Sequence, residues 1–177
     1  MIPLRDSERL FDPTLPNVVL MSAAVTTALM AGLFYAYSYS VSPGLARVSD
    51  TAYLSTMQSI NRAILNPVFF VGFMGTLFLL PLSTWLQYNH PPSARFCLLL
   101  GATLMYTIGV FGVTTLGNVP LNNALDAFNI DSATQEEIAA MRVRFEQPWN
   151  RLNNIRTLAA ILTEVLITAA LMSSRTP

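Results

Sequence analysis

Four long apolar stretches, almost free of charged residues, constrain this 177-residue chain more than any other feature of its sequence. They cover residues 18–41, 67–88, 96–117 and 155–172. Each approaches the roughly 20 residues with which an α-helix crosses about 30 Å of hydrocarbon. A membrane span must satisfy its own backbone hydrogen bonds, and these stretches lack the alternation of barrel strands. The sequence therefore predicts an all-α fold, a four-helix transmembrane bundle forming one domain over 1–177, in a multi-pass integral membrane protein.

The composition argues against several other classes of protein. Charged residues make up 11% of the chain and hydrophobic residues 53%, and the formal net charge is +0. Disorder needs low hydrophobicity and a nucleic-acid-binding surface needs a basic excess, so neither is expected. One histidine, His90, and one cysteine, Cys97, do not suffice for a histidine-built metal centre or a disulfide framework. We therefore expect no metal site.

Two amphipathic stretches lie between the spans. In residues 50–65 the apolar positions recur at helical spacing: Tyr53, Met57, Ile60 and Ile64. This pattern predicts a helix along the membrane surface. Before the last span, Ser132 and Gln135 form a predicted capping box that starts a second surface helix, and Pro148 is expected to end it. Counting crossings places both amphipathic helices on one face of the bundle.

Prolines also predict where two spans begin and end. Asn66 followed by Pro67 is a helix cap and first-turn pair, so the second span should start there. Pro120 disfavours helical geometry at Val119, so we expect the third span to leave the membrane as a turn over residues 117–123.

Small residues recur at regular spacing in two of the spans. In the first span they come at every fourth position: Ala24, Ala28, Gly32, Ala36 and Ser40. In the third span glycines come at every eighth position: Gly101, Gly109 and Gly117. Small side chains let a neighbouring backbone approach closely, so both sets predict contacts between helices.

Amide and guanidinium side chains gather on one side of the predicted membrane. Nine of the eleven asparagines fall there: Asn61, Asn66, Asn118, Asn122, Asn123, Asn129, Asn150, Asn153 and Asn154. Arg62, Arg151 and Arg156 join them, whereas the opposite side has short ends and a plain turn at 89–93. We therefore expect the functional face on this polar side.

The last span carries the strongest candidate site. Trp149, Asn153, Arg156, Thr163 and Glu164 share one side of a helix that runs unbroken from Trp149. Glu164 lies well inside the span, where an ionisable group costs at least ~2.5 kcal/mol, so it should face the interior and have a partner. Two interpretations stay open for this carboxyl group: a general base or proton shuttle, and a structural pair that clasps two helices.

Two further groups of residues have both a functional and a structural interpretation. The amides of Asn118 and Asn122 fit donation to an oxyanion and also the capping of broken helix ends. Aromatic residues crowd the polar-side ends of the first two spans: Phe34, Tyr35, Tyr37, Tyr39, Phe69, Phe70 and Phe73. These rings fit an interfacial aromatic belt and also a pocket for a flat aromatic ligand.

Three motifs together resemble the anthrone oxygenase-like family of small integral membrane proteins. They are residues 57–67 (MQSINRAILNP), 118–122 (NVPLN) and 149–157 (WNRLNNIRT). The resemblance spans nearly the whole chain. It implies a four-helix membrane protein that oxidises an anthrone to an anthraquinone with dioxygen, in polyketide pathways, without metal, flavin or other cofactor.

The chemistry of that reaction suggests roles for the polar residues. Glu164 would be the base or final proton acceptor, and Arg156 with Asn118 or Asn122 would stabilise the oxyanion. The remaining substrate-binding candidates are Gln58, Asn61, Arg62, Trp149, Asn153 and Tyr35. Gln58, Asn61 and Arg62 would roof the pocket. This hypothesis requires the amides and guanidinium groups to converge on a cavity that reaches down to Glu164.

The predicted function is therefore a cofactor-independent membrane monooxygenase. Its partners would be the lipid bilayer, dioxygen and a lipophilic aromatic small molecule, either anthrone-like or phenolic. Two alternatives stay open: a non-catalytic membrane protein that binds a quinone, lipid or partner subunit through its polar face, and a purely structural subunit. Assembly into a homo-oligomer is also left open.

Overall fold

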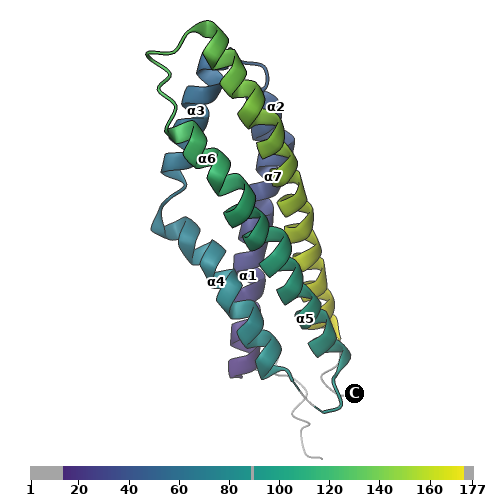
Figure 1. Ribbon diagram of the computed structural model, residues 1–177. Coiled ribbons are helices and arrows are strands. Elements are labelled where there is room, and N and C mark those ends of the chain that lie inside the picture. The colour runs from purple at the N-terminus through teal and green to yellow at the C-terminus, as the bar shows by residue number, and fades with distance from the viewer. Residues whose placement is uncertain (1–13, 89, 174–177) are drawn as a thin grey trace, which may run out of the picture.

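The computed structural model describes residues 14–88 and 90–173, and these residues form helices joined by short turns, without any strand (Figure 1). The predicted turn at 89–93 includes Asn89, which lies outside the described residues. Four helical segments are long and apolar enough to cross a membrane: Leu15–Leu45, Pro67–Leu86, Ala94–Asp126 and Gln135–Met172. The predicted all-α four-helix bundle is therefore confirmed.

Two of the long segments combine α-helical and π-helical turns. The first consists of α1 (Leu15–Ala36), the π-helical η1 (Tyr37–Val41) and α2 (Ser42–Leu45). The third consists of α5 (Ala94–Met105), η2 (Tyr106–Gly112), η3 (Thr114–Asn118) and α6 (Val119–Asp126). The other helices are α3 (Asp50–Ala63), α4 (Pro67–Leu86) and α7 (Gln135–Met172).

The helix boundaries follow one of the proline signals and contradict two. The predicted start of α4 is confirmed, because the Asn66 side chain accepts a hydrogen bond from the Phe69 amide at 3.1 Å and Pro67 occupies the first turn. The turn predicted at Pro120 is wrong, since the helix continues to Asp126. Pro148 does not end a surface helix either, because it lies inside α7. The second amphipathic stretch is therefore the first part of α7.

The capping box of α7 lies two residues after its predicted position. Thr134, not Ser132, is the cap: its hydroxyl accepts from the Glu137 amide at 3.3 Å, and the Glu137 carboxylate accepts from the Thr134 amide at 2.8 Å. Gln135 is the first residue of the helix rather than the far member of the box. Threonine and glutamate meet the same chemical requirement, and the sequence pattern alone did not separate the two registers.

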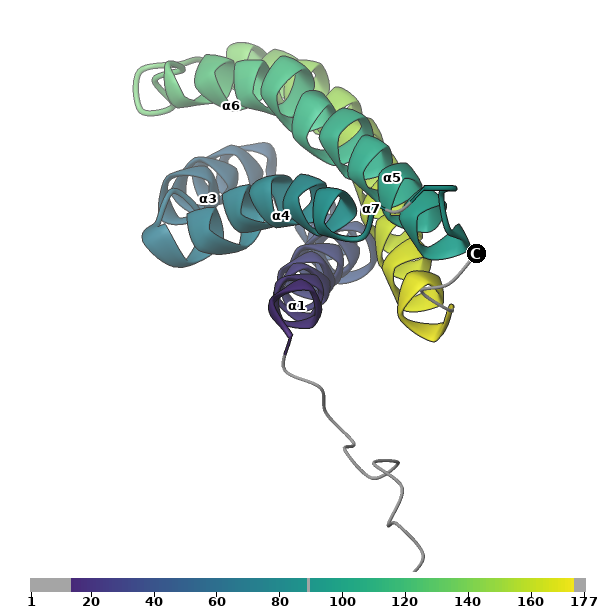
Figure 2. The same cartoon turned by 90° about the horizontal axis from the view of Figure 1, so that it is seen from below.

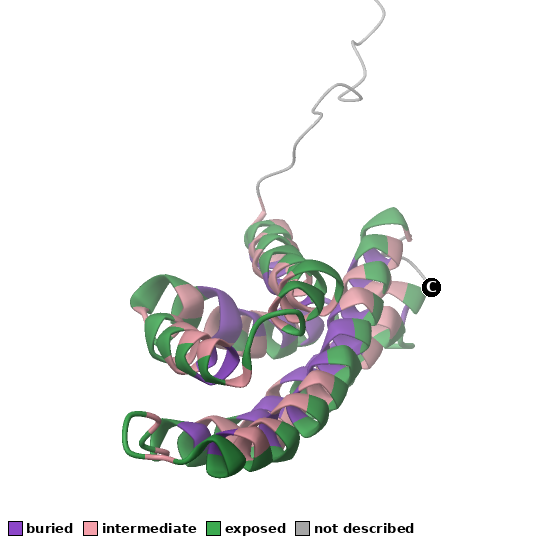
Figure 3. Ribbon diagram, turned by 90° about the horizontal axis from the view of Figure 1, so that it is seen from above, coloured by how far each residue is buried: buried purple, intermediate pink, exposed green. Residues whose placement is uncertain are grey.

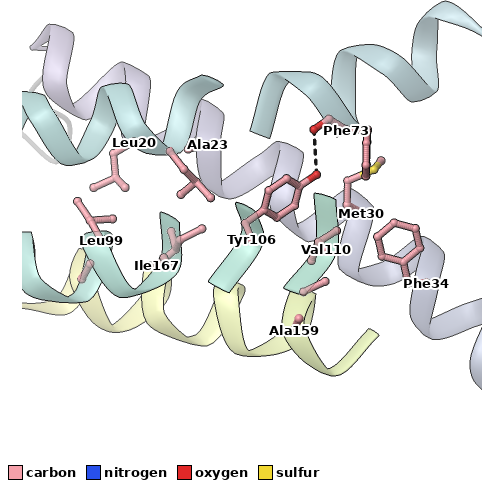
Figure 4. Close-up of a cluster of buried hydrophobic side chains, with 14 residues drawn as sticks. Leu20, Ala23, Met30, Phe34, Phe73, Leu99, Tyr106, Val110, Ala159 and Ile167 are labelled. Carbon is pink, nitrogen blue, oxygen red and sulfur yellow. Dashed lines mark hydrogen bonds between the residues drawn. The ribbon is translucent and has the colours of Figure 1, made fainter. Parts of the chain in front are cut away.

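The membrane-spanning helices pack as two pairs that share a core (Figure 2). α1 packs against α4 and α7, and α5 packs against α7 and α4. Side chains from all four helices meet in a buried apolar cluster that includes Leu20, Phe73, Leu99 and Ile167. Figure 4 shows Tyr106 at its centre, where the hydroxyl donates to the Phe73 carbonyl at 2.9 Å. We call this the membrane core.

A second cluster joins the helices at the polar end, seen at the top of Figure 1. It contains Tyr53, Leu54 and Met57 of α3, Leu125 of α6, and Ile138, Phe145 and Trp149 of α7. The apolar stripe of α3 is thus buried against protein, because these three α3 side chains are at most 2% exposed. Arg142 ties the first part of α7 to α3 through Asp50 at 2.8 Å. We call this the polar-end cluster.

The two predicted sets of small residues behave differently. Side chains added at Gly109 and Gly117 would overlap α7, at 2.6 Å from Ala159 and 2.8 Å from Leu152, so this set does make helix contacts. In the first span four members of the set are exposed, Ala28, Gly32, Ala36 and Ser40, and nothing lies within 4 Å of a side chain built at Gly32. The helices bury one face and expose the other, as Figure 3 shows. The prediction of a helix contact is therefore wrong for these four positions within this chain, whereas Ala24 does pack against the membrane core.

Candidate functional site

A cavity of about 90 Å³ lies where the polar-end cluster meets the membrane core. Its aromatic walls are Phe34, Tyr37, Phe69 and Trp149, and its aliphatic walls are Leu33, Ile60, Ile64, Leu65 and Val119. Four polar side chains reach it: Asn61, Thr114, Asn122 and Arg156. Contributions from α1, α3, α4, the η3–α6 segment and α7 make it the point on which the helices converge. The predicted hollow at the polar side therefore exists.

Arg156 is the main charged group of this cavity. The residue is 8% exposed, and its guanidinium carbon lies 4.5 Å from the centroid of the Phe34 ring and 5.2 Å from that of Trp149. Both aromatic faces offer favourable cation–π contact. None of the carboxylates in the described part of the chain forms an ion pair with it. A full positive charge therefore stands in an aromatic cavity with neutral partners only.

Neutral hydrogen bonds hold the guanidinium group in place. Its Nε and one terminal nitrogen donate to the side-chain oxygen of Asn153 at 3.1 and 2.9 Å. The other terminal nitrogen lies 3.5 Å from the Thr114 hydroxyl oxygen, a long contact. Asn153 is itself fixed, because its amide nitrogen donates to the Ser38 hydroxyl at 2.8 Å. These contacts position Arg156 from η1, from η3 and from α7 itself.

The predicted amides divide between satisfied and unsatisfied groups. The Trp149 indole donates to the side-chain oxygen of Asn122 at 2.8 Å, and both residues line the cavity. The amide nitrogen of Asn61, which also lines the cavity, is buried without an acceptor. Asn118 is fully buried and donates to the Trp149 carbonyl at 3.4 Å, while its side-chain oxygen has no donor. Buried polar groups are normally paired, so the unpaired Asn61 nitrogen is a ready donor to a ligand.

Six predicted site residues do not line the cavity. Two of them, Asn118 and Asn153, instead hydrogen-bond to the lining residues Trp149 and Arg156. Gln58 instead donates to the backbone carbonyls of Leu125 and Phe128 at 2.8 and 2.9 Å, and so binds α3 to the end of α6. Arg62 is exposed and pairs with Asp126. Tyr35 is 52% exposed and packs on Tyr39 with ring centroids 4.6 Å apart, on the outer face of α1.

Glu164 is also among these six residues, and it lies about two helical turns below Arg156, or roughly 12 Å along α7. It is not part of the cavity wall, so the cavity does not reach it. The expectation of a partner is also wrong within the described residues, because its Oε2 is buried without one.

Four aromatic or polar cavity residues were not among the predicted site residues: Phe34, Tyr37, Phe69 and Thr114. The sequence shows the three aromatic residues only as members of a crowded group, without an indication of which ones point inward. Thr114 gave no signal, because a threonine in a helix commonly bonds its own backbone, as here to the Val110 carbonyl at 2.7 Å. Its side chain faces Arg156 because the surrounding turns are π-helical.

Comparison with known proteins identifies a family. The family model described as anthrone oxygenase matches residues 58–166, more than half of the 177 residues. The chain belongs to the anthrone oxygenase family. The matched region contains every polar residue that lines the cavity, from Asn61 to Arg156. No match was found among curated proteins or among solved structures.

The site of this anthrone oxygenase family member is suited to hold an anionic oxygen next to flat rings. The guanidinium group supplies positive charge, Asn61 supplies an unpaired N–H, and the aromatic walls supply flat apolar surface. In the described part of the chain, no three metal-ligating side chains of the His, Cys, Asp or Glu type come together. The arrangement therefore favours chemistry in which negative charge develops on the oxygen of an aromatic ligand.

Proposed function

We propose that this protein oxidises a lipophilic anthrone-like or phenolic substrate with dioxygen at the cavity around Arg156. The observation that supports this proposal most strongly is that the guanidinium group is buried and has no carboxylate partner among the described residues. Burying an unpaired charge is costly, and an anionic oxygen of a ligand would offset that cost. Membership of the anthrone oxygenase family supports an oxygenase-like activity.

The reaction begins with a proton loss that the positive charge favours. An anthrone carries a CH₂ group between two aryl rings, and removal of one proton leaves an enolate whose charge rests mainly on the carbonyl oxygen. Placed beside Arg156 and the Asn61 amide, that oxygen gains a charge-assisted hydrogen bond. The enolate then becomes accessible at a lower cost in free energy, and the aromatic walls exclude water from it.

The remaining steps need only the substrate and dioxygen. The enolate passes one electron to dioxygen, and the resulting carbon radical and superoxide combine to form a carbon–oxygen bond. After protonation of the peroxide, the O–O bond breaks, the second C–H proton leaves and water is released. One oxygen atom ends in the quinone carbonyl and the other in water, while the substrate supplies all four electrons. This balance is the basis for proposing a cofactor-independent monooxygenase.

We propose an indirect role for Glu164, as the final acceptor of the substrate proton. Because it does not line the cavity, it would accept the substrate proton through an intervening relay rather than by direct contact. Its unpaired Oε2 supports this role. Replacement of Glu164 by Gln tests the relay independently of Arg156: the expected result is slower turnover with an unchanged KM, and unchanged turnover would remove Glu164 from the mechanism.

The decisive experiment measures dioxygen uptake and quinone formation in membranes supplied with anthrone. Arg156→Gln should lower kcat/KM by about 10²–10³-fold, the usual effect of removing an oxyanion donor. Arg156→Lys should retain part of the activity, because it keeps the charge but not the planar fork. Arg151→Gln is the matched control, since Arg151 is an exposed arginine on the same helix.

Three results would contradict the proposal. Wild-type turnover no higher than that of empty membranes, across several anthrones and phenols, would rule out the proposed oxygenase activity. Anthrone binding without dioxygen uptake would favour the non-catalytic binding protein instead. Full activity in Arg156→Gln, with the variant folded as judged by thermal melting, would place the chemistry elsewhere.

A further inference from the structure

A second hollow, an apolar groove of about 590 Å³, lies between α1 and the start of α4. Large apolar side chains on its outer rim are exposed: Leu29 is 61% exposed, Val68 83% and Val71 69%. Both helices are long and apolar enough to cross a membrane, so this rim faces the hydrocarbon of the bilayer. We call this hollow the lateral groove.

A single layer of side chains separates the lateral groove from the Arg156 cavity. Leu33, Ile64 and Phe69 line both hollows. Phe69 lies in the first turn of α4 and stacks on Phe73 with ring centroids 5.3 Å apart. Rotamer changes of leucine and phenylalanine side chains are fast and need no movement of helices. The wall between the two hollows is thus built from side chains that can swing aside.

The sizes of the two hollows complement each other. Ligand pockets usually measure roughly 300–1,000 Å³, whereas the cavity holds about 90 Å³ and the groove about 590 Å³. A planar aromatic molecule that reaches Arg156 must therefore extend past Leu33 and Phe69 into the groove. On its polar side the cavity is lined by the α3 residues Ile60 and Asn61 and by the hydrogen-bonded pair Trp149 and Asn122.

We infer that the lateral groove is the entrance through which a planar lipophilic aromatic molecule passes from the bilayer to Arg156, with Leu33 and Phe69 as its gate. The bound molecule occupies the cavity and the inner part of the groove together. A lipophilic substrate concentrates in hydrocarbon because its apolar surface leaves water, so an entrance in the membrane meets it where it is most abundant. The identity of the substrate rests on the proposed function, whereas the route does not require turnover.

Trp149 provides a direct reporter of entry. It is 3% exposed and lines the cavity, whereas the other tryptophan, Trp85, is 71% exposed and lines neither hollow. In a Trp85→Phe, Cys97→Ser background, Trp149 is the sole tryptophan and no cysteine remains. The experiment mixes liposomes that contain this protein with liposomes that contain 9-bromoanthracene, whose bromine quenches indole fluorescence, and follows the rate of quenching.

Two matched cysteine variants then test the route. Val71→Cys places a thiol in the groove, and Ile108→Cys places one at a lipid-facing position outside it, where exposure is nearly the same: 69% against 68%. Labelling with a bulky maleimide should slow quenching about tenfold or more in the first variant, a change within the usual range for association rates. The label in the second should leave the rate unchanged. Phe69→Ala, which opens the gate, should speed quenching.

The outcomes separate this inference from the proposed function. Equal quenching rates in the two labelled proteins would contradict entry through the lateral groove. They would not bear on the proposed oxygenase activity. Absence of quenching in the unlabelled protein would contradict this entry as well, because no aromatic molecule would then reach Trp149. Slower quenching with the Val71 label, combined with no anthrone turnover, would establish the route and count against the oxygenase alone.

Discussion

At the scale of single residues, the most informative contact is that between Arg156 and Asn153. An asparagine oxygen accepts two hydrogen bonds from the guanidinium group, at 3.1 and 2.9 Å, but contributes no negative charge. An aspartate would hold the group in the same place and neutralise it. The neutral amide therefore fixes Arg156 and leaves its charge available to a ligand.

The neutral contact between Asn153 and Arg156 predicts the effect of Asn153→Asp. The new carboxylate would pair with Arg156 inside the cavity, so we expect kcat/KM for anthrone to fall by about 10²-fold. Thermal stability should hold or rise, because a buried charge gains a charged partner. The measurement pairs dioxygen uptake with thermal melting in detergent.

Asn154→Asp serves as the control for that variant. It adds the same charge at the next position of α7, where the side chain is exposed, so activity should be retained. Full activity in Asn153→Asp would show that the reaction does not use the positive charge of Arg156.

The sequence predicted part of the cavity and missed part of it for identifiable reasons. Arg156, Trp149 and Asn61 are found from the sequence because they lie on the polar side, within the motifs 57–67 and 149–157. The sequence favours Tyr35 although Tyr37 lines the cavity, because the first span is apolar on all sides and its pattern does not reveal which face is buried. Gln58 and Arg62 contact α6 instead, a partner that sequence spacing could not supply.

At the scale of the helix, the third span shows how π-helical turns set which side chains face inward. In a regular α-helix, eight residues overshoot two turns by roughly 80°, so glycines at that spacing would drift off one face. η2 and η3 take more residues per turn, and Gly101, Gly109 and Gly117 all stay against α7. Thr114 is brought to the cavity by the same turns.

Glycine substitutions test that packing. A methyl group at Gly109 would lie 2.6 Å from the Ala159 Cβ atom, so Gly109→Ala must push η2 and α7 apart. We expect it to lower the free energy of unfolding by about 1–3 kcal/mol. Gly32→Ala meets nothing within 4 Å and should stabilise the protein by about 0.5–1 kcal/mol. Unfolding in mixed detergent micelles measures both, and equal effects of the two changes would refute the close approach at Gly109.

Prolines were the least reliable signals for helix boundaries. Pro148 normally costs a helix interior about 3 kcal/mol, yet α7 continues through it because buried side chains lie on both sides of it, including Phe145 and Trp149. Pro148 itself is exposed, so its missing hydrogen bond lies at the surface of the bundle. The helix is thus kept by the packing of its buried face against other helices. A rule based on the proline alone does not include that packing.

At the scale of the whole molecule, the bundle has one polar end and one plain end. The polar-end cluster, the cavity and the turn between α6 and α7 lie together, and the turn between α4 and α5 lies at the other end (Figure 1). This arrangement follows from the four long apolar helices and was predictable from hydropathy. Hydropathy could not locate the cavity equally well, because the cavity depends on how five segments of the chain pack together.

The arrangement predicts which positions share a side of the membrane. In a Cys97→Ser background, Gly44→Cys and Ser132→Cys lie at the polar end, and Ala94→Cys lies at the other; all three positions are exposed. In sealed, uniformly oriented vesicles, a membrane-impermeant maleimide should label the first two together. The third should react only from the opposite side. Labelling of all three from one side would contradict four crossings.

The length of α7 has a consequence for how such a protein can change its substrate. Trp149, Asn153 and Arg156 come from this one helix, whereas most of the other rings and aliphatic groups that line the cavity come from the first span, α3, the α3–α4 turn and α4. Under the proposed function, the selection of a substrate by its shape and the binding of its anion rest mainly on different parts of the chain. Substitutions on α1 and α4 should therefore change which molecules bind, while α7 and its anion-binding side chains stay unchanged. This makes the fold a practical starting point for engineering substrate selectivity.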